Sequence, residues 1–354
     1  MNNYMKNEKI FIKYKNKGLT GLANVGNSCY LNSCMQIFSH IYELNDFLED
    51  EKYKKRINRK VESLILIEWD KLRKMMWDTN CIIAPYGFVK AVQKVAQIKG
   101  RNLFSGYAQN DIQEFLLFIV DCFHVALSRE VDMQISGKPV DSQDLLAKEC
   151  YEMMKNMYKR EYSEILGIFY GIHVSEVSCL ETGERLSLRP EPFSVLSLPI
   201  PHGGVEQHLM DCIELYCKKE AMTGDNAWFN DKLNKKQDIN RGIIFWSLPE
   251  ILIIDLKRWG DRGQKIHTFV SVPINDADFT KFVKGYNKQS YIYDLLGVYN
   301  HSGGSSGGHY TACVKNANGK WYEFNDTLVK EVKEDNIISK QSYCFFYRKK
   351  KISE

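Results

Sequence analysis

The stretch Gly21-Leu-Ala-Asn-Val-Gly-Asn-Ser-Cys-Tyr-Leu-Asn-Ser-Cys-Met-Gln36 places Cys29 between a glycine-containing turn and an apolar segment. The glycines permit backbone angles that other residues avoid, and Asn27 or Ser28 offers a side-chain oxygen for capping a helix. A thiol at a helix N-terminus loses its proton more readily, which makes Cys29 a candidate nucleophile, although Cys29 alone fits a buried structural cysteine equally simply. Apolar residues then recur at roughly helical spacing and predict a buried helix: Tyr30, Leu31, Cys34, Met35, Ile37 and Phe38.

The composition is that of a globular protein. The chain has 354 residues, 44% of them hydrophobic and 26% charged, which is enough for one large domain or about two smaller ones. The net charge is only +4, and the basic runs at 13–17 and 348–351 lie near the ends of the chain. Because basic and aromatic residues do not gather on one element, we expect no nucleic-acid binding.

The sequence also predicts a location. No stretch approaches the roughly 20 apolar residues of a membrane span, and residues 1–17 are too polar for a signal peptide. The ten cysteines form no dense framework, which indicates free thiols in a reducing compartment. We therefore expect a cytoplasmic or nuclear protein that does not interact with membranes.

The first half of the chain reads as helical. Residues 1–17 form a polar, basic leader, predicted to be mobile or an edge strand, and helices follow to about residue 99. One helix carries apolar residues that we predict to be core: Leu64, Ile65, Ile67, Trp69, Leu72, Met75, Met76 and Trp77. Another, over 104–118, carries Gln109 and Asp111 at its start, where an acid alone would fit a helix cap.

The second half reads mostly as sheet. Residues 169–179 alternate like a strand, and 186–200 predict short strands broken at Pro190, Pro192 and Pro199. A helix is expected over 207–219, and the apolar run 250–256 predicts a central strand. Residues 301–308 are predicted to form a flexible loop that ends at His309.

His309 begins a predicted hairpin whose register is open. Folding about Ala317 places His309 opposite Asn325, whereas a turn centred on Asn318-Gly319 shifts the register by three and leaves Asn325 or Asp326 diagonally near. A cysteine, a distant histidine and an Asn or Asp that orients the ring are the elements of a thiol acyl hydrolase. Asn24, on the turn before Cys29, can donate its amide hydrogens to an oxyanion, or can simply form the turn.

These residues resemble a family. The segments 21–36, 107–115, 252–258 and 307–326 resemble, in order and spacing, the motifs of ubiquitin-specific proteases, the papain-like cysteine deubiquitinases. The likeness covers about residues 18–348 and implies an α+β fold with a helical thumb, a β-sheet palm and β fingers. It implies a single catalytic domain over 18–354, with the thumb over about 18–165, mostly fingers and the start of the palm over 166–255, and the palm over 256–354.

The resemblance assigns roles to individual residues. Cys29 matches the nucleophile, His309 the general base and Asn325 the third triad residue. Asn24 matches the oxyanion-hole residue, and Asp326 the acid that helps to polarise or position the site. The binding of the ubiquitin tail is assigned by the resemblance to Gln109, Asp111 and Tyr310, and the segments 259–266 and 299–308 match the two blocking loops.

The chain departs from the family pattern at three places. Asn325 stands where many members have Asp, so the ring can still be oriented but the carboxylate is missing. Ser28 replaces the usual Thr. The structural zinc of many members needs two Cys-x-x-Cys pairs, but Cys179 is followed by Thr182, and the second pair corresponds to Trp228 and Asp231. One cysteine does not make a tetrahedral site, so we expect no zinc and no other cofactor.

The resemblance implies a thiol-dependent deubiquitinase that hydrolyses isopeptide or peptide bonds after the C-terminal glycine of ubiquitin. The expected partners are ubiquitin or ubiquitinated proteins, and we expect a monomer. Two alternatives stay open: a catalytically silent ubiquitin-binding module, and a protease for a ubiquitin-like modifier.

Overall fold

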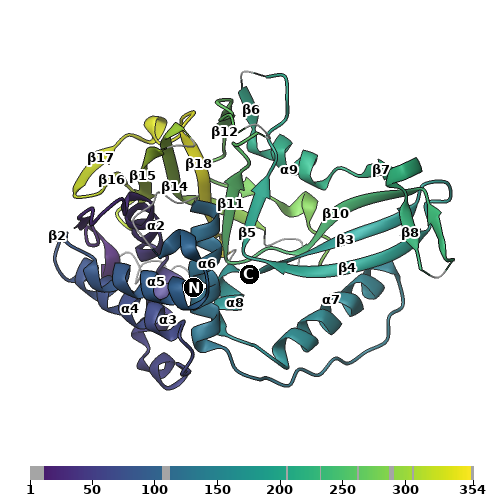
Figure 1. Ribbon diagram of the computed structural model, residues 1–354, viewed down its shortest axis with the longest axis horizontal. Helices are drawn as coiled ribbons and strands as arrows, with labels where there is room; N and C mark the ends of the chain where they lie inside the picture. Colours follow the sequence, from purple (N-terminus) through teal and green to yellow (C-terminus); the bar gives the residue numbers. More distant parts are fainter. Residues whose placement is uncertain are drawn as a thin grey trace.

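The computed structural model describes residues 12–105, 112–204, 206–231, 233–260, 263–286, 291–304 and 307–351. Figure 1 shows a group of helices, drawn in purple and blue, packed against a sheet that ends in yellow, and a long narrow sheet in teal that projects away from both. Most helices gather in one region, whereas the sheets, with α7 (Ser142–Tyr158) and α9 (Leu209–Cys217) beside them, form the rest of the molecule, which confirms the predicted α+β fold.

The helical region is built around the cysteine helix. Every residue of that helix, α2, is buried, because neighbouring helices cover one side and the main sheet covers the other. The helices of this region are α2 (Cys29–Ser39), α3 (Tyr42–Glu49), η1 (Glu51–Lys55), α4 (Ser63–Asp78), α5 (Tyr86–Ile98), η2 (Asn102–Phe104), α6 (Ile112–Leu127) and α8 (Glu164–Phe169). The helices predicted up to about residue 99 are confirmed, the one predicted over 104–118 is observed as α6 with other bounds, and α8 was not predicted. In α4 the core prediction is wrong for Met75 and Ile67, which are 50% and 37% exposed on its outer face.

The main sheet lies under α2. Its strand order is β17-β16-β15-β14-β18-β11-β5, with β13 also pairing with β14. The bounds are β5 (Val195–Leu198), β11 (Ile251–Leu256), β13 (Ala277–Asp278), β14 (Ile292–Gly304), β15 (Gly307–Lys315), β16 (Trp321–Asn325), β17 (Leu328–Val332) and β18 (Ser342–Lys349). All of β11 is buried between β18 and β5, which confirms the predicted central strand.

Two contacts fix α2 on this sheet. The Tyr299 hydroxyl on β14 donates to the Tyr30 carbonyl at 2.9 Å. Gly297 lies so close to Ile37 that a Cβ there would be 3.0 Å from the isoleucine side chain. The start of the cysteine helix is therefore held by the same strands that lead to His309.

Several short elements lie outside the two large sheets. They are β1 (Gly21–Leu22) with β2 (Ile82–Ile83), β6 (Glu206–His208) with β12 (Phe269–Ser271), α9 (Leu209–Cys217), η4 (Thr280–Phe282) and η6 (Glu334–Asn336). The helix predicted over 207–219 is confirmed as α9. No helix in the described part of the chain combines the length and the apolar character that crossing a membrane requires.

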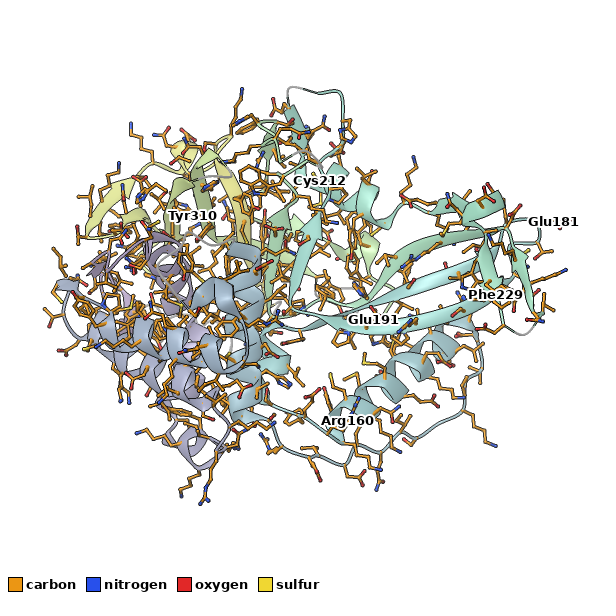
Figure 2. All side chains as sticks on the ribbon, in the orientation of Figure 1. Arg160, Glu181, Glu191, Cys212, Phe229 and Tyr310 are labelled. Carbon is orange, nitrogen blue, oxygen red and sulfur yellow. The ribbon has the colours of Figure 1, made fainter. Side chains whose placement is uncertain are left out.

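The projecting sheet has the strand order β4-β3-β10-β7. Its strands are β3 (Gly171–Cys179), β4 (Arg185–Phe193), β7 (Glu220–Met222) and β10 (Ile239–Ser247). Between β7 and β10 the chain forms η3 (Gly224–Asn226) and a separate two-stranded sheet of β8 (Trp228–Asn230) and β9 (Lys235–Gln237). Glu181 and Phe229 mark its far end in Figure 2. The predicted breaks at Pro190 and Pro192 are wrong, because β4 runs through both. A proline cannot donate to the ladder, but β4 is an edge strand and needs donors on one side only.

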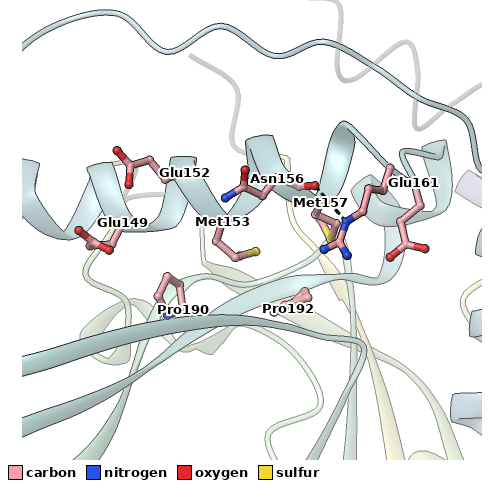
Figure 3. A pocket seen from close by; sticks show the side chains of 9 residues that line it. Glu149, Glu152, Met153, Asn156, Met157, Glu161, Pro190 and Pro192 are labelled. Carbon is pink, nitrogen blue, oxygen red and sulfur yellow. Dashed lines mark hydrogen bonds between the residues drawn. The ribbon is translucent and has the colours of Figure 1, made fainter. Parts of the chain in front are cut away.

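Helix α7 (Ser142–Tyr158) packs beside β4 (Figure 3). The Asp141 carboxylate caps it by accepting from the amides of Gln143 and Asp144, both at 2.8 Å. Met153 and Met157 face Pro190 and Pro192 across a groove of about 470 Å³. The helix thus covers part of a sheet that would otherwise be open to solvent.

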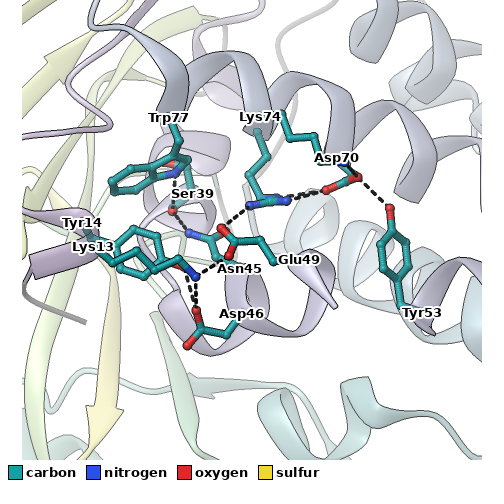
Figure 4. Close-up of polar contacts among 11 residues, drawn as sticks. Lys13, Tyr14, Ser39, Asn45, Asp46, Glu49, Tyr53, Asp70, Lys74 and Trp77 are labelled. Atoms are coloured by element: carbon teal, nitrogen blue, oxygen red, sulfur yellow. Dashed lines mark hydrogen bonds and ion pairs between the residues drawn. The ribbon is translucent and has the colours of Figure 1, made fainter. Parts of the chain in front are cut away.

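The N-terminal residues are attached to the helices. Residues 12–14 are helical, and Tyr14 is buried with its ring stacked on Tyr42 at 4.5 Å, so these residues are neither mobile nor an edge strand as predicted. Lys13 pairs with Asp46 at 2.8 Å and with Glu49 (Figure 4). The polar N-terminal segment therefore adds to the helical region from residue 12 onward.

A buried ion pair lies next to this contact (Figure 4). Arg73 and Asp70 are both almost fully buried, with their charged atoms 2.7 Å apart. The Tyr53 hydroxyl and the Lys74 ammonium also contact the carboxylate, at 2.7 and 3.0 Å. These neighbours lower the pKa of Asp70 against the opposing effect of its burial, so the carboxylate is charged.

We predict that Arg73→Met lowers the free energy of unfolding by about 3 kcal/mol, because it leaves the Asp70 charge buried without its main partner. Urea unfolding measures the change. The control is Lys71→Met, which breaks an exposed ion pair with Glu68 and should cost less than about 1 kcal/mol. Equal losses in the two variants would contradict the prediction.

Candidate active site

The turn before Cys29 is held against the far end of the chain. The Leu22 amide donates to the Asp326 carbonyl at 2.9 Å, and a Cβ at Gly21 would overlap the Thr327 carbonyl. Position 21 therefore requires glycine because two backbone segments about 300 residues apart in sequence touch there. This contact brings the cysteine turn beside the end of β16.

Asn24 organises the turn itself. Its Oδ1 accepts from the amides of Gly26 at 3.2 Å and Ser28 at 3.1 Å. Ser28 is the N-cap residue of α2, but its side chain makes no cap hydrogen bond, so the predicted capping role of its hydroxyl is wrong. The Ser28 hydroxyl instead accepts from the Val25 amide at 2.9 Å, within the turn. The turn is thus closed by side chains before the helix begins at Cys29.

His309 and Asn325 lie on neighbouring strands, β15 and β16. The His309 Nε2 is 2.7 Å from the Asn325 Oδ1, and both side chains are half-buried. An amide oxygen only accepts, so Nε2 carries the hydrogen and Nδ1 is left with its lone pair. The third residue therefore fixes the tautomer of the ring.

Neither predicted register of this hairpin is the observed one. Ala312 pairs with Phe324 and Lys315 with Trp321, which centres the turn on Asn318, between the two alternatives. Asn325 consequently reaches the imidazole from a diagonal position. The predicted loop at 301–308 is also wrong in extent, because β14 continues to Gly304 and β15 begins at Gly307, with backbone pairing that needs no side chains.

Asp326 contacts the cysteine turn and the cysteine helix. Its Oδ1 accepts from the Asn32 amide at 2.8 Å and its Oδ2 from the Asn24 amide at 3.1 Å. Asp326 also has a positive φ of 50°, so the chain turns sharply after Asn325 and the two side chains diverge. Asn325 thus contacts the imidazole, whereas Asp326 holds the asparagine of the cysteine turn and leaves the second Asn24 amide hydrogen for another acceptor.

The Cys29 thiol is buried. Burial is the main cause that raises its pKa, and the Asp326 carboxylate adds to the increase. The Tyr310 amide donates to the sulfur and opposes this change. The expectation that the helix N-terminus gives Cys29 a lowered pKa is therefore wrong for the free protein. Since Tyr310 follows His309 directly, the same hydrogen bond places the histidine strand against the thiol.

Tyr310 is buried between the helices and the main sheet (Figure 2). Gln109 and Asp111, the other two predicted binding residues, lie outside the described residues. Sequence reasoning missed Asn32, which is 1% exposed and also donates to the carbonyls of Leu22 and Ala23. An asparagine in a helix predicted to be buried, three residues after the cysteine, was the available signal.

The projecting sheet does not offer the residues of a zinc site. The Cys179 thiol accepts hydrogen bonds from Thr182 and Gln237, which lower its pKa. Among the described residues no group of three or more His, Cys, Asp or Glu side chains is placed to hold a metal ion. The expected absence of zinc stays a prediction, which metal analysis of the purified protein tests.

Known proteins resemble this chain over nearly its whole length. Residues 20–347 match the family model for ubiquitin carboxyl-terminal hydrolase. Ubiquitin carboxyl-terminal hydrolase 2 of Homo sapiens is 32% identical over 341 residues, which cover 94% of this chain and 55% of the human protein. The protein of that name from Gallus gallus is 32% identical over 342 residues, covering 94% of this chain and 93% of its own. The chain thus spans about half the length of the human relative.

The fold also matches solved structures. The SAGA Ubp8/Sgf11/Sus1/Sgf73 DUB module bound to ubiquitin aldehyde contains a chain that aligns with a TM-score of 0.72 at 22% identity, over 96% of this chain and 71% of that one. This likeness confirms the predicted thumb, palm and fingers. The helical region is the thumb, the main sheet the palm and the projecting sheet the fingers.

We predict that Asp326→Asn shifts the pH profile of Cys29 alkylation by iodoacetamide to lower pH. A nearby negative charge disfavours the thiolate and raises the pKa of the thiol, so removing the charge lowers that pKa. Peptide mass analysis at each pH measures modification of Cys29. Asp335→Asn, the same change at an exposed acid, should leave the profile in place. A profile that stays or moves to higher pH in Asp326→Asn would contradict the prediction.

Proposed function

The chain belongs to the ubiquitin carboxyl-terminal hydrolase family, and from this we propose that it is a thiol-dependent deubiquitinase that hydrolyses isopeptide or peptide bonds after the C-terminal glycine of ubiquitin. The observation that carries the proposal is the meeting of α2 with the β15–β16 hairpin. There the Tyr310 amide contacts the Cys29 thiol, and the adjacent His309 is oriented by Asn325.

In the proposed mechanism His309 is the general base. Its Nδ1 accepts the thiol proton, and the thiolate attacks the carbonyl carbon of the terminal glycine. His309 then returns the proton to the departing amine as the C–N bond breaks, which leaves a thioester. Water, deprotonated by His309, attacks the thioester, and the carboxylate of ubiquitin and the free thiol are regenerated. Because burial raises the pKa of Cys29, the thiol depends on this base for its activation.

Asn24 is the proposed oxyanion-hole donor. Asp326 accepts one of its amide hydrogens at 3.1 Å and thereby points the nitrogen along a fixed direction. The second hydrogen is available to the oxyanion that forms when the carbonyl is attacked. Asp326 is accordingly proposed to position Asn24 rather than His309, and Asn325 to serve as the third triad residue.

The remaining assignments are proposals of the same kind. Gln109, Asp111 and Tyr310 are proposed to bind the ubiquitin tail. Residues 18–354 are proposed to form one catalytic domain that acts as a monomer, with a leader before it. All ten cysteines are free thiols in the structure, which supports a cytosolic or nuclear location.

The experiment that tests the proposal uses a fluorogenic amide of the ubiquitin C-terminus. Wild-type protein should cleave it, and Cys29→Ala should abolish cleavage while leaving the far-UV circular dichroism unchanged. A panel of ubiquitin and ubiquitin-like probes with C-terminal electrophiles separates the alternatives. Capture only by another modifier would favour a protease for that modifier, and binding of ubiquitin without covalent capture would favour a silent module.

For the oxyanion role we predict that Asn24→Ala lowers kcat about 100-fold or more, equivalent to about 3 kcal/mol, and changes KM by less than about twofold. The control is Ser28→Ala, because the Ser28 hydroxyl supports the same turn but does not face the proposed oxyanion. It should lower kcat less than about fivefold. Equal losses in the two variants would mean that Asn24 only supports the turn.

A further inference from the structure

Lys265 joins two segments that are distant in sequence. Its ammonium donates to the His301 carbonyl at 2.7 Å and to the Gly303 carbonyl at 3.3 Å, and it lies 3.0 Å from the His301 Nδ1. Lys265 belongs to the segment after β11, where it pairs with Trp259 in a β-bridge, and His301 lies on β14. One side chain thus ties the segment after β11 to the hairpin that carries His309.

His301 is enclosed on both sides of its ring. It is 3% exposed, its Nδ1 faces Lys265, and its Nε2 lies so close to Gly308 that a Cβ there would overlap it. Burial and the positive charge of Lys265 lower the pKa of His301 to about 4, so the ring is neutral at physiological pH. A neutral Nδ1 with its lone pair toward the ammonium accepts a hydrogen bond from Lys265. Lys265 and His301 can therefore form this hydrogen bond without a carboxylate to balance the ammonium charge.

The His301 ring stacks on Tyr310. The two ring centroids are 4.4 Å apart with 28° between the planes, and the two residues pair directly across β14 and β15. Trp259 approaches the other side of His301 at 6.0 Å, and its ring lies 5.9 Å from the Lys265 ammonium. Stacked rings of this kind restrict one another beyond the effect of their burial. The contacts of His301 with Lys265 and Trp259 thus help to hold its ring in the stack with Tyr310.

From Tyr310 the contacts continue to the cysteine. Its ring lies 5.1 Å from the Tyr299 ring, and the Tyr299 hydroxyl holds the Tyr30 carbonyl on the first turn of α2. Its amide donates to the Cys29 thiol. From Lys265, contacts therefore lead through the rings of His301 and Tyr310 to the Cys29 sulfur, and through the further ring of Tyr299 to the backbone at the start of α2.

We propose that Lys265 and His301 are positioning residues that hold Tyr310, and with it the neighbouring His309, against the Cys29 thiol. The catalytic consequence rests on the proposed function, whereas the effect on the thiol does not. Neither residue touches the reacting atoms. Without the Lys265 contact the hairpin moves away from α2, the Tyr310 hydrogen bond to sulfur weakens, and the base is no longer aligned with the thiol.

The test compares Lys265→Met, Lys265→Arg and Lys340→Met. Arginine keeps a cation that donates to both carbonyls, whereas methionine keeps only the apolar stem. Lys340 is an exposed lysine beside Gln341, whose carbonyl accepts from the His301 amide, so Lys340→Met is the same change without the contacts. For each protein kcat, KM, the thermal midpoint and the pH profile of Cys29 alkylation by iodoacetamide are measured.

We expect Lys265→Met to lower kcat about tenfold with KM changed less than about twofold, because misalignment affects the reaction more than binding. Its alkylation profile should move to higher pH, because a hydrogen bond that favours the thiolate is lost. Lys265→Arg should restore at least half of kcat and the original profile, and Lys340→Met should behave as wild type. If Lys265→Met does not fold, Lys265→Gln takes its place in the same measurements.

The proposal would be overturned if Lys265→Met kept the kcat and the alkylation profile of the wild type. It would also be overturned if Lys265→Arg lost as much kcat as Lys265→Met and the loss in both variants paralleled a fall in the thermal midpoint. The two proposals fail separately. If the wild-type protein cleaves no ubiquitin amide but Lys265→Met still moves the alkylation profile, the positioning role stands and the deubiquitinase function falls.

Discussion

The site depends on the carboxylate of Asp326, which joins a segment near the start of the chain to one near its end. It accepts from Asn24 on the cysteine turn and from Asn32 inside the cysteine helix, and its own carbonyl accepts from Leu22. Hydrogen bonds to an ionised group are stronger than those between neutral groups. Two of them here connect the thumb to the turn between β16 and β17 of the palm, one from the cysteine turn and one from the cysteine helix. The site therefore forms only when the first and last parts of the chain have folded together.

In the proposed mechanism, activation of the Cys29 thiol depends more on the position of His309 than on a lowered pKa of the thiol. Burial raises the pKa of the Cys29 thiol, and Asn325, the proposed third triad residue, offers the imidazole an oxygen but no charge. Activation therefore requires His309 to be aligned closely with the sulfur, since proton transfer needs hydrogen-bond distance. The stacked rings of His301 and Tyr310 and the Lys265 contact supply this alignment from the side of the sheet. The orientation of His309 therefore depends on the packing of these side chains against the hairpin.

The sequence predicted most of the helices and strands, because periodic apolar residues depend on local chemistry, and it named Cys29, His309 and Asn325, which the structure brings to the meeting of α2 with the β15–β16 hairpin. It was insufficient where tertiary contacts decide. The hairpin register differs from both predicted registers, since it is fixed by the pairing of residues 312–315 of β15 with residues 321–324 of β16. The hydroxyl of Ser28 bonds within the turn because Asn24 already holds the Ser28 amide. The pKa of Cys29 could not be read from a helix N-terminus, because burial and the Asp326 charge raise it more than the backbone hydrogen bonds to the sulfur lower it. The binding role of Gln109 and Asp111 stays a prediction from the sequence.

The two prolines of β4 have a further consequence for the fingers. An edge strand normally presents a row of free amides that can pair with a strand of another molecule. Pro190 and Pro192 remove two such donors from β4, an outer strand of the projecting sheet, and α7 stands beside the same strand (Figure 3). The β4 edge of the fingers is therefore a poorer site for pairing with a strand of another molecule, and so for aggregation, than an edge with all its amides.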